Sequence, residues 1–193
     1  MSNPNLKNLR SDLLSDNWYT LRKYTYDYRN ADGTWGEQQR EAYDRGNGAA
    51  ILLYNRDRRT VILTRQFRLP TFVNGNADGM MIEVCAGLLD DDAPLDCARK
   101  EAMEETGYHV GEVEKVFEAY MSPGSVTEIL YFFVGEYDAD MKQSAGGGLA
   151  EEQEKIEVLE MGFDEALAAV ASGEIRDAKT IMLLYHMRVG GVL

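Results

Sequence analysis

The chain is poor in the residues that build zinc sites, haem sites and disulfides. It has 193 residues but only two cysteines and two histidines. Cys85 and Cys97 lack the spacing of a zinc motif, so we expect both to be reduced packing residues rather than a disulfide. His109 and His186 have no carboxylate or serine partner nearby in the sequence, and we assign neither a catalytic role. Nothing supports a serine or cysteine nucleophile.

Long apolar runs and net positive charge are also lacking. No stretch is long enough to span a bilayer, and the N-terminus has no apolar core of a signal peptide, so we expect a cytoplasmic protein without a membrane partner. The formal net charge is −13, which argues against binding nucleic acid through its phosphates. A small phosphorylated substrate would need local positive charge from bound metal and a few Arg or Lys side chains.

The order of predicted elements favours an α/β (α+β) fold. Aromatic and β-branched residues predict an N-terminal antiparallel β-hairpin with arms at 18–28 and 34–43. An isolated hairpin is marginal in water, so we expect residues 1–45 to form a β-rich dimerisation segment and residues 46–193 a separate domain. Further strands are predicted at 49–54, 60–67, 80–86, 113–121, 126–137 and 156–161, helices at 94–106, 164–171 and 177–187, and a polar surface loop at 138–154. This order predicts an α/β/α sandwich around a mixed sheet.

Three glutamates within the first predicted helix indicate a metal site. Glu101, Glu104 and Glu105 are spaced i, i+3 and i+4, which places them on one face of a regular helix. Their mutual repulsion, a few tenths of a kcal/mol per pair, would be offset by a cation. Carboxylates without adjacent histidine or cysteine suit Mg²⁺, or alternatively Mn²⁺. The competing interpretation is a solvated helix face.

The stretch that carries these glutamates resembles the Nudix box, the signature of hydrolases that cleave nucleoside diphosphates linked to another group. The matching residues are Gly87, Glu101, Ala102, Glu104, Glu105, Gly107 and Tyr108. Lys100 stands where the family has arginine, Ala93 stands where it has its first glutamate, and the spacing from Gly87 to Lys100 is one residue short. The resemblance implies a Nudix-type sandwich and metal-assisted hydrolysis of a diphosphate.

Segments outside the box resemble the GDP-mannose pyrophosphatases of this family. They are 14–18, 43–48, 65–68, 122–124, 126–128, 145–148 and 173–177. This similarity implies hydrolysis of GDP-mannose to GMP and mannose 1-phosphate. Two alternatives stay open: an ADP-ribose or ADP-sugar pyrophosphatase with the same chemistry, and a module that binds a nucleotide sugar without cleaving it.

The resemblance also implies a metal and catalytic set. The Mg²⁺ ligands would be the backbone carbonyl of Ala86 and the carboxylates of Glu101, Glu105 and Glu154. Glu154 would be the general base, with Glu104 as the alternative, and Glu105 belongs to the catalytic set through the metal. Because residues 150–156 are longer than we expect of relatives, Glu151 or Glu152 is an alternative to Glu154.

The implied substrate contacts come from both ends of the chain. They are Trp18, Gln39, Arg40, Glu41, Arg68, Ala86, Gly87, Glu128, Gln153 and Lys179. Arg68 and Lys179 would meet phosphate oxygens, although both also fit ordinary surface charges. Trp18 would lie against the nucleobase or else form interface core. Residues 39–41 would reach over from the partner of a homodimer, with Gln39 where a basic residue is expected, and Glu128 would approach the sugar or diphosphate.

Overall fold

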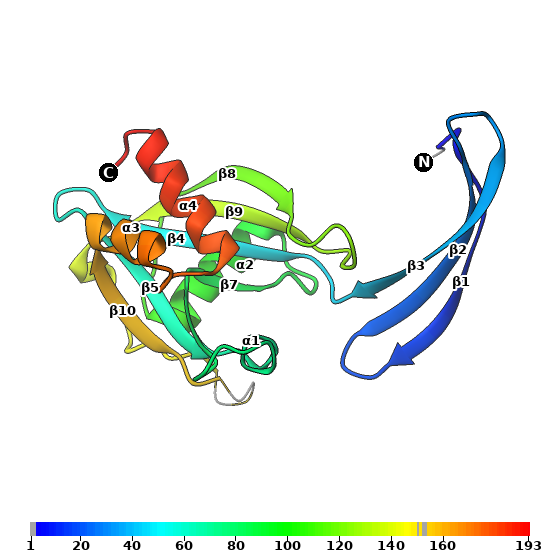
Figure 1. Cartoon of the computed structure of the whole chain (residues 1–193). Helices are drawn as coiled ribbons and strands as arrows, with labels where there is room; N and C mark the ends of the chain where they lie inside the picture. The colour runs from blue at the N-terminus through cyan, green and yellow to red at the C-terminus, as the bar shows by residue number, and fades with distance from the viewer. Residues whose placement is uncertain (1–2, 150, 152–153) are drawn as a thin grey trace. The chain divides into compact units, whose positions relative to one another are not determined.

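The computed structural model describes residues 3–149, 151 and 154–193, and these divide into two compact units (Figure 1). One unit contains the residues up to Asn47 together with Tyr120–Ile129. The other contains Gly48–Ala119 and Leu130–Leu193. The boundary at residue 45 stays a prediction. In the described part of the chain, no helix combines the length and apolarity needed to cross a membrane.

The first unit is built on a three-stranded antiparallel sheet of order β1-β2-β3. Its strands are β1 (Leu6–Asp16), β2 (Thr20–Arg29) and β3 (Trp35–Asp44). The predicted hairpin is confirmed as β2 and β3, but the prediction was incomplete because it left out β1. Nearly every residue of β1 is exposed, so the strand lacks the alternation of apolar and polar residues that marks a half-buried strand.

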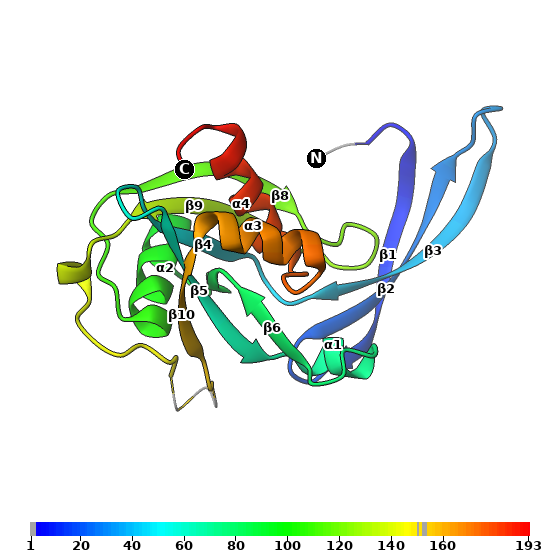
Figure 2. The ribbon, with the colours of Figure 1, turned by 60° about the vertical axis from the view of Figure 1, so that its left-hand side comes forward.

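The second unit contains a seven-stranded mixed sheet of order β10-β5-β4-β9-β8, in which β6 pairs with β5 and β7 pairs with β4 (Figure 2). Strands β4 and β9 run parallel, whereas the pairs β4–β5, β4–β7, β5–β6 and β5–β10 are antiparallel. The strands are β4 (Gly48–Asn55), β5 (Thr60–Phe67), β6 (Met80–Glu83), β7 (Cys85–Leu88), β8 (Val113–Tyr120), β9 (Ile129–Glu136) and β10 (Glu157–Gly162).

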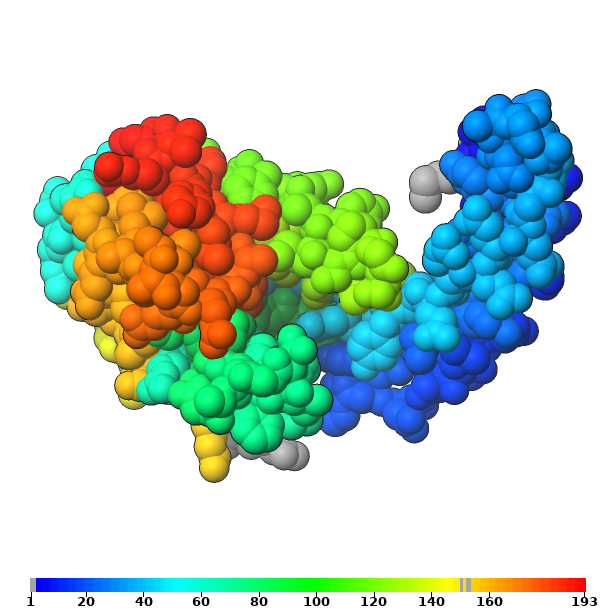
Figure 3. Space-filling model, in the orientation of Figure 1, coloured from blue at the N-terminus to red at the C-terminus, as the bar shows by residue number. Residues whose placement is uncertain are grey.

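Helices cover both faces of this sheet. The α-helices of the unit are α1 (Leu69–Val73), α2 (Pro94–Glu101), α3 (Phe163–Ser172) and α4 (Ala178–Val189), of which α2, α3 and α4 pack on the sheet. Helix α2 packs on β4 and β7, while α4 contacts β4 and α3, and Figure 3 shows α3 and α4 together on one face of the unit. Ile51 and Leu53 of β4 join the core beneath α2, so the alternating Ala50 and Leu52 point to the other face. The predicted α/β/α arrangement is confirmed.

Two local predictions were wrong. The strand predicted at 80–86 is divided at Val84, where the chain leaves β5 and joins β4, because the Val84 N–H donates to the Thr180 hydroxyl of α4 at 2.8 Å. The segment after β5, for which the sequence predicted no helix, contains α1, with Pro70 in its first turn. Cys85 and Cys97 are free and buried, as predicted.

Candidate metal and phosphate site

Glycine at position 87 allows the Glu101 carboxylate of the box helix to lie against β7. A Cβ at Gly87 would lie 1.8 Å from Oε1 of Glu101 and 2.1 Å from its carboxyl carbon. The Glu101 carboxylate therefore occupies the space that a side chain on β7 would fill, one residue from Ala86. This places two of the predicted metal ligands on adjoining parts of the helix and the strand.

Glu105 is the most deeply buried carboxylate of the box. Only 1% of the residue is exposed, and its Oε2 finds no hydrogen-bond donor among the described residues. Burial, followed by the charges of Glu101 and Glu154, raises the pKa of Glu105 well above its usual range. A buried carboxylate with an unused oxygen is costly unless a cation binds there, so this geometry fits a hard divalent ion.

The glutamates do not lie on a regular helix as predicted. The α-helix ends at Glu101, and η1 (Ala102–Thr106) is a π-helix that ends at Gly107 in the left-handed conformation. Glu105 is consequently buried while Glu101 and Glu104 are partly exposed. Within the described chain, no three His, Cys, Asp or Glu side chains form a metal-ligand cluster, so the predicted set of Glu101, Glu105 and Glu154 stays a prediction.

The altered first half of the box retains an ion pair. Lys100 lies 3.8 Å from Asp92, which is the neighbour of the Ala93 that replaces the family's first glutamate. About half of each side chain is exposed, so the pair contributes little to stability. Ala93 serves as the N-cap of α2 without a side-chain hydrogen bond, ahead of Pro94.

The glycine-rich segment is bonded to the end of the box helix. The N–H of Gly147 donates to the carbonyl of Glu105 at 2.8 Å, and that of Gly148 donates to the carbonyl of Glu104 at 3.1 Å. Gly148 has a φ of 78°, and a Cβ there would lie 2.4 Å from Oε2 of Glu154. These bonds bring Glu154 close to Glu105, in agreement with the electrostatic effect of Glu154 on the pKa of Glu105.

Of the alternatives to Glu154, the structure describes Glu151 but not Glu152. Glu151 is exposed. Glu152 and the predicted substrate contact Gln153 lie outside the described residues. Glu154 itself accepts a hydrogen bond from the N–H of Leu149 at 3.0 Å, which orients its carboxylate.

The two predicted phosphate-binding cations meet on a carboxylate that sequence reasoning missed. Arg68 donates from Nε to Oε2 of Glu83 at 2.9 Å, and its Nη2 forms an ion pair with the same oxygen at 2.8 Å. Lys179 donates from Nζ to Oε1 of Glu83 at 3.1 Å and to Asp177 at 3.0 Å. Glu83 stands in the apolar sequence MMIEVCAG, and a lone charge in a buried strand was the signal that could have found it.

Electrostatics favours the ionised forms of Glu83 and Arg68. Burial alone would raise the pKa of Glu83, but Lys179 and Arg68 outweigh it and bring the pKa below its usual value. Burial would likewise lower the pKa of Arg68, yet the adjacent Glu83 raises it. Lys179 lies in the first turn of α4, where the helix dipole disfavours a cation, and its two carboxylate partners compensate for that position.

The other predicted contacts belong to the first unit. Trp18 lies in the connection between β1 and β2 rather than in a strand as predicted, because β2 begins at Thr20. It is 85% exposed and meets Tyr19 edge-on, with ring centroids 6.4 Å apart. Glu128 is held by Arg45 at 3.6 Å and only 14% of its side chain is exposed.

A hollow of about 670 Å³ lies within the first unit beside β3. Arg40, Glu41 and Ala42 line it on one side, and Tyr120 and residues 123–127 line it on the other. Two of the three predicted partner contacts on β3 therefore face a space of ligand size, while Gln39 is not among its lining residues.

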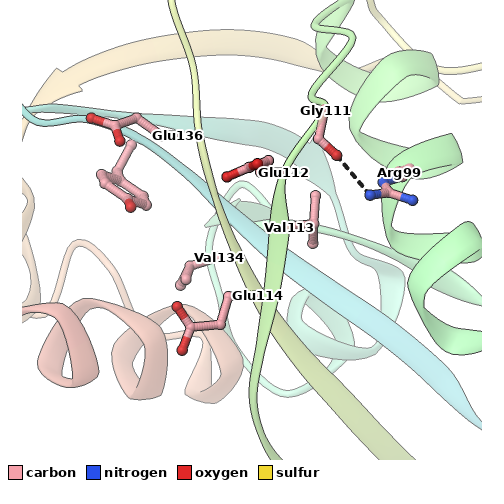
Figure 4. Close-up of a pocket in the computed structure, with 8 residues that line it drawn as sticks. Arg99, Gly111, Glu112, Val113, Glu114, Val134 and Glu136 are labelled. Atoms are coloured by element: carbon pink, nitrogen blue, oxygen red, sulfur yellow. Dashed lines mark hydrogen bonds between the residues drawn. The ribbon is translucent and has the colours of Figure 1, made fainter.

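Another hollow, of about 420 Å³, lies in the second unit away from the box glutamates (Figure 4). Its charged lining consists of Glu112, Glu114 and Glu136 together with Arg99, which donates from Nη2 to the carbonyl of Gly111 at 2.6 Å. Three carboxylates and one engaged arginine do not suit a diphosphate. The candidate site is therefore the group around Glu105 and Glu83.

Comparison with known proteins identifies the family. A model described as the NUDIX domain matches residues 44–184. The chain belongs to the NUDIX family. Enzymes of this family typically depend on a divalent metal, and the NUDIX domain here contains both the box glutamates and the cation pair. A second model, described as the N-terminal domain of GDP-mannose pyrophosphatase NudK, matches residues 5–43.

Relatives similar to this NUDIX protein extend over nearly its whole length. GDP-mannose pyrophosphatase of Yersinia enterocolitica serotype O:8 / biotype 1B is 58% identical over 188 residues, covering 97% of both chains. The protein of the same name from Yersinia pestis (strain Pestoides F) is 58% identical over 184 residues, covering 95% of this chain and 92% of that one. That of Cronobacter sakazakii is 56% identical over 189 residues, covering 98% of both.

Proposed function

We propose that this protein hydrolyses the diphosphate bond of GDP-mannose in a Mg²⁺-dependent reaction, giving GMP and mannose 1-phosphate. The relatives named GDP-mannose pyrophosphatase are 56–58% identical and match in both parts of the chain. The observation that carries the chemistry is the buried Glu105 carboxylate, which has an oxygen without a donor among the described residues and lies beside Glu101. A cation held there would face a diphosphate bound by Arg68 and Lys179.

The metal would be held by Glu101, Glu105, Glu154 and the backbone carbonyl of Ala86, with Mn²⁺ as an alternative to Mg²⁺. When bound, Mg²⁺ supplies charge that polarises phosphate oxygens and favours deprotonation of the attacking water. Gly87 contributes by leaving the space that the Glu101 carboxylate fills. Arg68 and Lys179 donate hydrogen bonds to phosphate oxygens and so hold the diphosphate in place.

A carboxylate of the chain would accept the proton of the attacking water. Glu154 is our choice because the glycine-rich segment brings it to the box helix and the N–H of Leu149 orients it. Glu104 is the alternative, and Glu151 remains a candidate on sequence grounds. The kinetic effect of Glu154→Gln compared with Glu104→Gln distinguishes the first two, because loss of the base lowers kcat far more than KM.

We also propose a homodimer formed through the N-terminal segment. Large apolar side chains of the three-stranded sheet and its connections are exposed in the single chain, and a partner subunit would cover them: Leu9, Leu13, Leu14, Trp18, Tyr28 and Trp35. In such a dimer, Gln39, Arg40 and Glu41 would serve the partner's substrate, and Trp18 and Glu128 would complete the site. Sedimentation equilibrium of the full chain tests this, and a monomer at micromolar concentration contradicts it.

The substrate is tested with a panel of nucleotide sugars in the presence of Mg²⁺, with products separated by chromatography. We expect GMP and mannose 1-phosphate from GDP-mannose, and no products when EDTA replaces Mg²⁺. Faster turnover of ADP-ribose would favour the ADP-sugar alternative. Binding of GDP-mannose without any product release would instead indicate a nucleotide-sugar-binding module.

A further inference from the structure

The carboxylate of Glu83 joins the two cations of the candidate site. Arg68 follows β5, Glu83 ends β6 and Lys179 lies in the first turn of α4, so three separate elements converge on one side chain. We propose that Glu83 is a positioning residue, which holds Arg68 and Lys179 side by side so that their remaining N–H groups face the substrate's diphosphate. This inference rests on the proposed function, because it assigns Glu83 a role in the same site.

The hydrogen-bond geometry leaves donors for a ligand. A guanidinium has five N–H groups and an ammonium has three. Glu83 engages Nε and Nη2 of Arg68, so the Nη1 edge can donate to a second acceptor. Lys179 donates to Glu83 and Asp177, which leaves the third N–H of its ammonium. The Arg68 side chain is 39% exposed and that of Lys179 is 13% exposed, so a ligand can reach both more readily than it can reach the Glu83 side chain, at 5%.

The position of Lys179 is fixed from a second direction. Asp177 is the N-cap of α4 and accepts hydrogen bonds from the N–H and the hydroxyl of Thr180, at 2.9 and 2.6 Å. The same Thr180 hydroxyl accepts from the N–H of Val84, the residue after Glu83. The side chains of Glu83 and Lys179 are therefore bonded to each other, and the residue that follows each of them is held by a backbone hydrogen bond, which restricts where the Lys179 ammonium can lie.

The charges of this group favour a positioning role over a role as base. Two cations and two carboxylates, Glu83 and Asp177, make a neutral group in the absence of substrate. Both cations close together without Glu83 would repel each other, and each would move toward solvent. Each oxygen of Glu83 accepts a hydrogen bond from one of the two cations, and their charges lower the pKa of Glu83, which makes its carboxylate a weaker base.

The test uses Glu83→Gln, which keeps the shape and removes the charge, and Glu83→Asp, which keeps the charge. We expect Glu83→Gln to raise KM for GDP-mannose about tenfold, and to weaken GDP-mannose binding to the protein in EDTA by a similar factor, because charge-assisted hydrogen bonds of the cations are misdirected. Glu83→Asp should recover part of that loss. In a background with Arg68→Gln and Lys179→Met, Glu83→Gln should have no further effect on KM.

The control is Glu160→Gln, which removes another ion-paired carboxylate, bonded to Arg58 at 2.7 Å, in the same domain. It should lower stability and leave KM unchanged. If Glu83→Gln behaves like this control, or if it tightens binding of GDP-mannose by relieving negative charge, the positioning role is refuted. Failure of the wild-type protein to hydrolyse GDP-mannose would refute the proposed function instead, so the two failures are distinguishable.

Discussion

Substitution of Glu105 by glutamine should stabilise the metal-free protein while abolishing its hydrolase activity. The Glu105 carboxylate is 1% exposed, lacks a donor for Oε2 among the described residues, and lies near Glu101. An unsatisfied buried polar group costs about 1–3 kcal/mol. Glutamine has nearly the same volume, carries no charge, and has an N–H₂ group that can donate a hydrogen bond to the Glu101 carboxylate. We therefore expect a gain of about 1–2 kcal/mol in the free energy of unfolding without metal.

The assay is urea or thermal unfolding in EDTA, followed by the same measurement in Mg²⁺. For a chain of this length, each kcal/mol corresponds to roughly 2–4 °C in Tm. Wild type should gain stability when Mg²⁺ is added, because the ion binds only the folded state, whereas Glu105→Gln should not. Glu114→Gln removes an exposed carboxylate on β8 and should change stability by less than about 0.5 kcal/mol.

The result that would refute this reasoning is specific. If Glu105→Gln destabilises the metal-free protein, the contacts of the wild-type Glu105 carboxylate stabilise the fold by more than its burial costs. If the variant keeps both the Mg²⁺-induced shift and turnover, the metal is held elsewhere.

Three further perturbations address other parts of the molecule. Gly87→Ala would place a Cβ 1.8 Å from the Glu101 carboxylate and should lower Mg²⁺-dependent kcat/KM about 100-fold or more. Gly111→Ala is the control and should leave kcat/KM unchanged, because a Cβ there would have no atom within 4 Å. Trp18→Ala should leave unfolding of the NUDIX domain unchanged because the residue is 85% exposed. A higher KM would assign Trp18 to the nucleobase, and dissociation of the dimer in sedimentation would assign it to the interface. If KM and the oligomeric state are both unchanged, both roles are contradicted. Burial alone would raise the pKa of Glu160, but the hydrogen bond from Tyr137 and its arginine partner lower it below the ordinary 4.5. Wild type should therefore exceed Glu160→Gln in the free energy of unfolding by about 1 kcal/mol above pH 4.5, and this difference should vanish as the pH falls through the lowered pKa of Glu160. Urea unfolding at pH 7 and in acid measures the difference. A difference that grows in acid contradicts the prediction.

Local patterns in the sequence predicted most of the fold. The strand at 60–67 and the start of the box helix at Pro94 were correct, because β-branched residues, glycine and proline act over a few residues. The first strand was missed because its exposed faces carry no apolar alternation. The division of the strand at Val84 was missed because its cause is a hydrogen bond to Thr180, which is distant in sequence.

The site was predictable only where a motif defines it. Glu101, Glu104 and Glu105 are part of the box, but the π-helix that buries Glu105 more deeply than the others follows from packing rather than from spacing. Arg68 and Lys179 came from resemblance alone. Glu83, which joins those two cations, was missed because no motif includes it and only tertiary structure brings its partners together.

The change of sheet partner at Val84 has a consequence for refolding. Glu83 is paired with Thr64 of β5, whereas Ala86 is paired with Ala50 of β4, so a single short segment spans two sheet neighbours. The complete site can acquire its geometry only when both pairings have formed and α4 has docked, and these contacts are distant in sequence. Recovery of catalytic activity after dilution from denaturant should accordingly lag behind recovery of far-UV circular dichroism. Enzyme activity would then report completion of the central sheet.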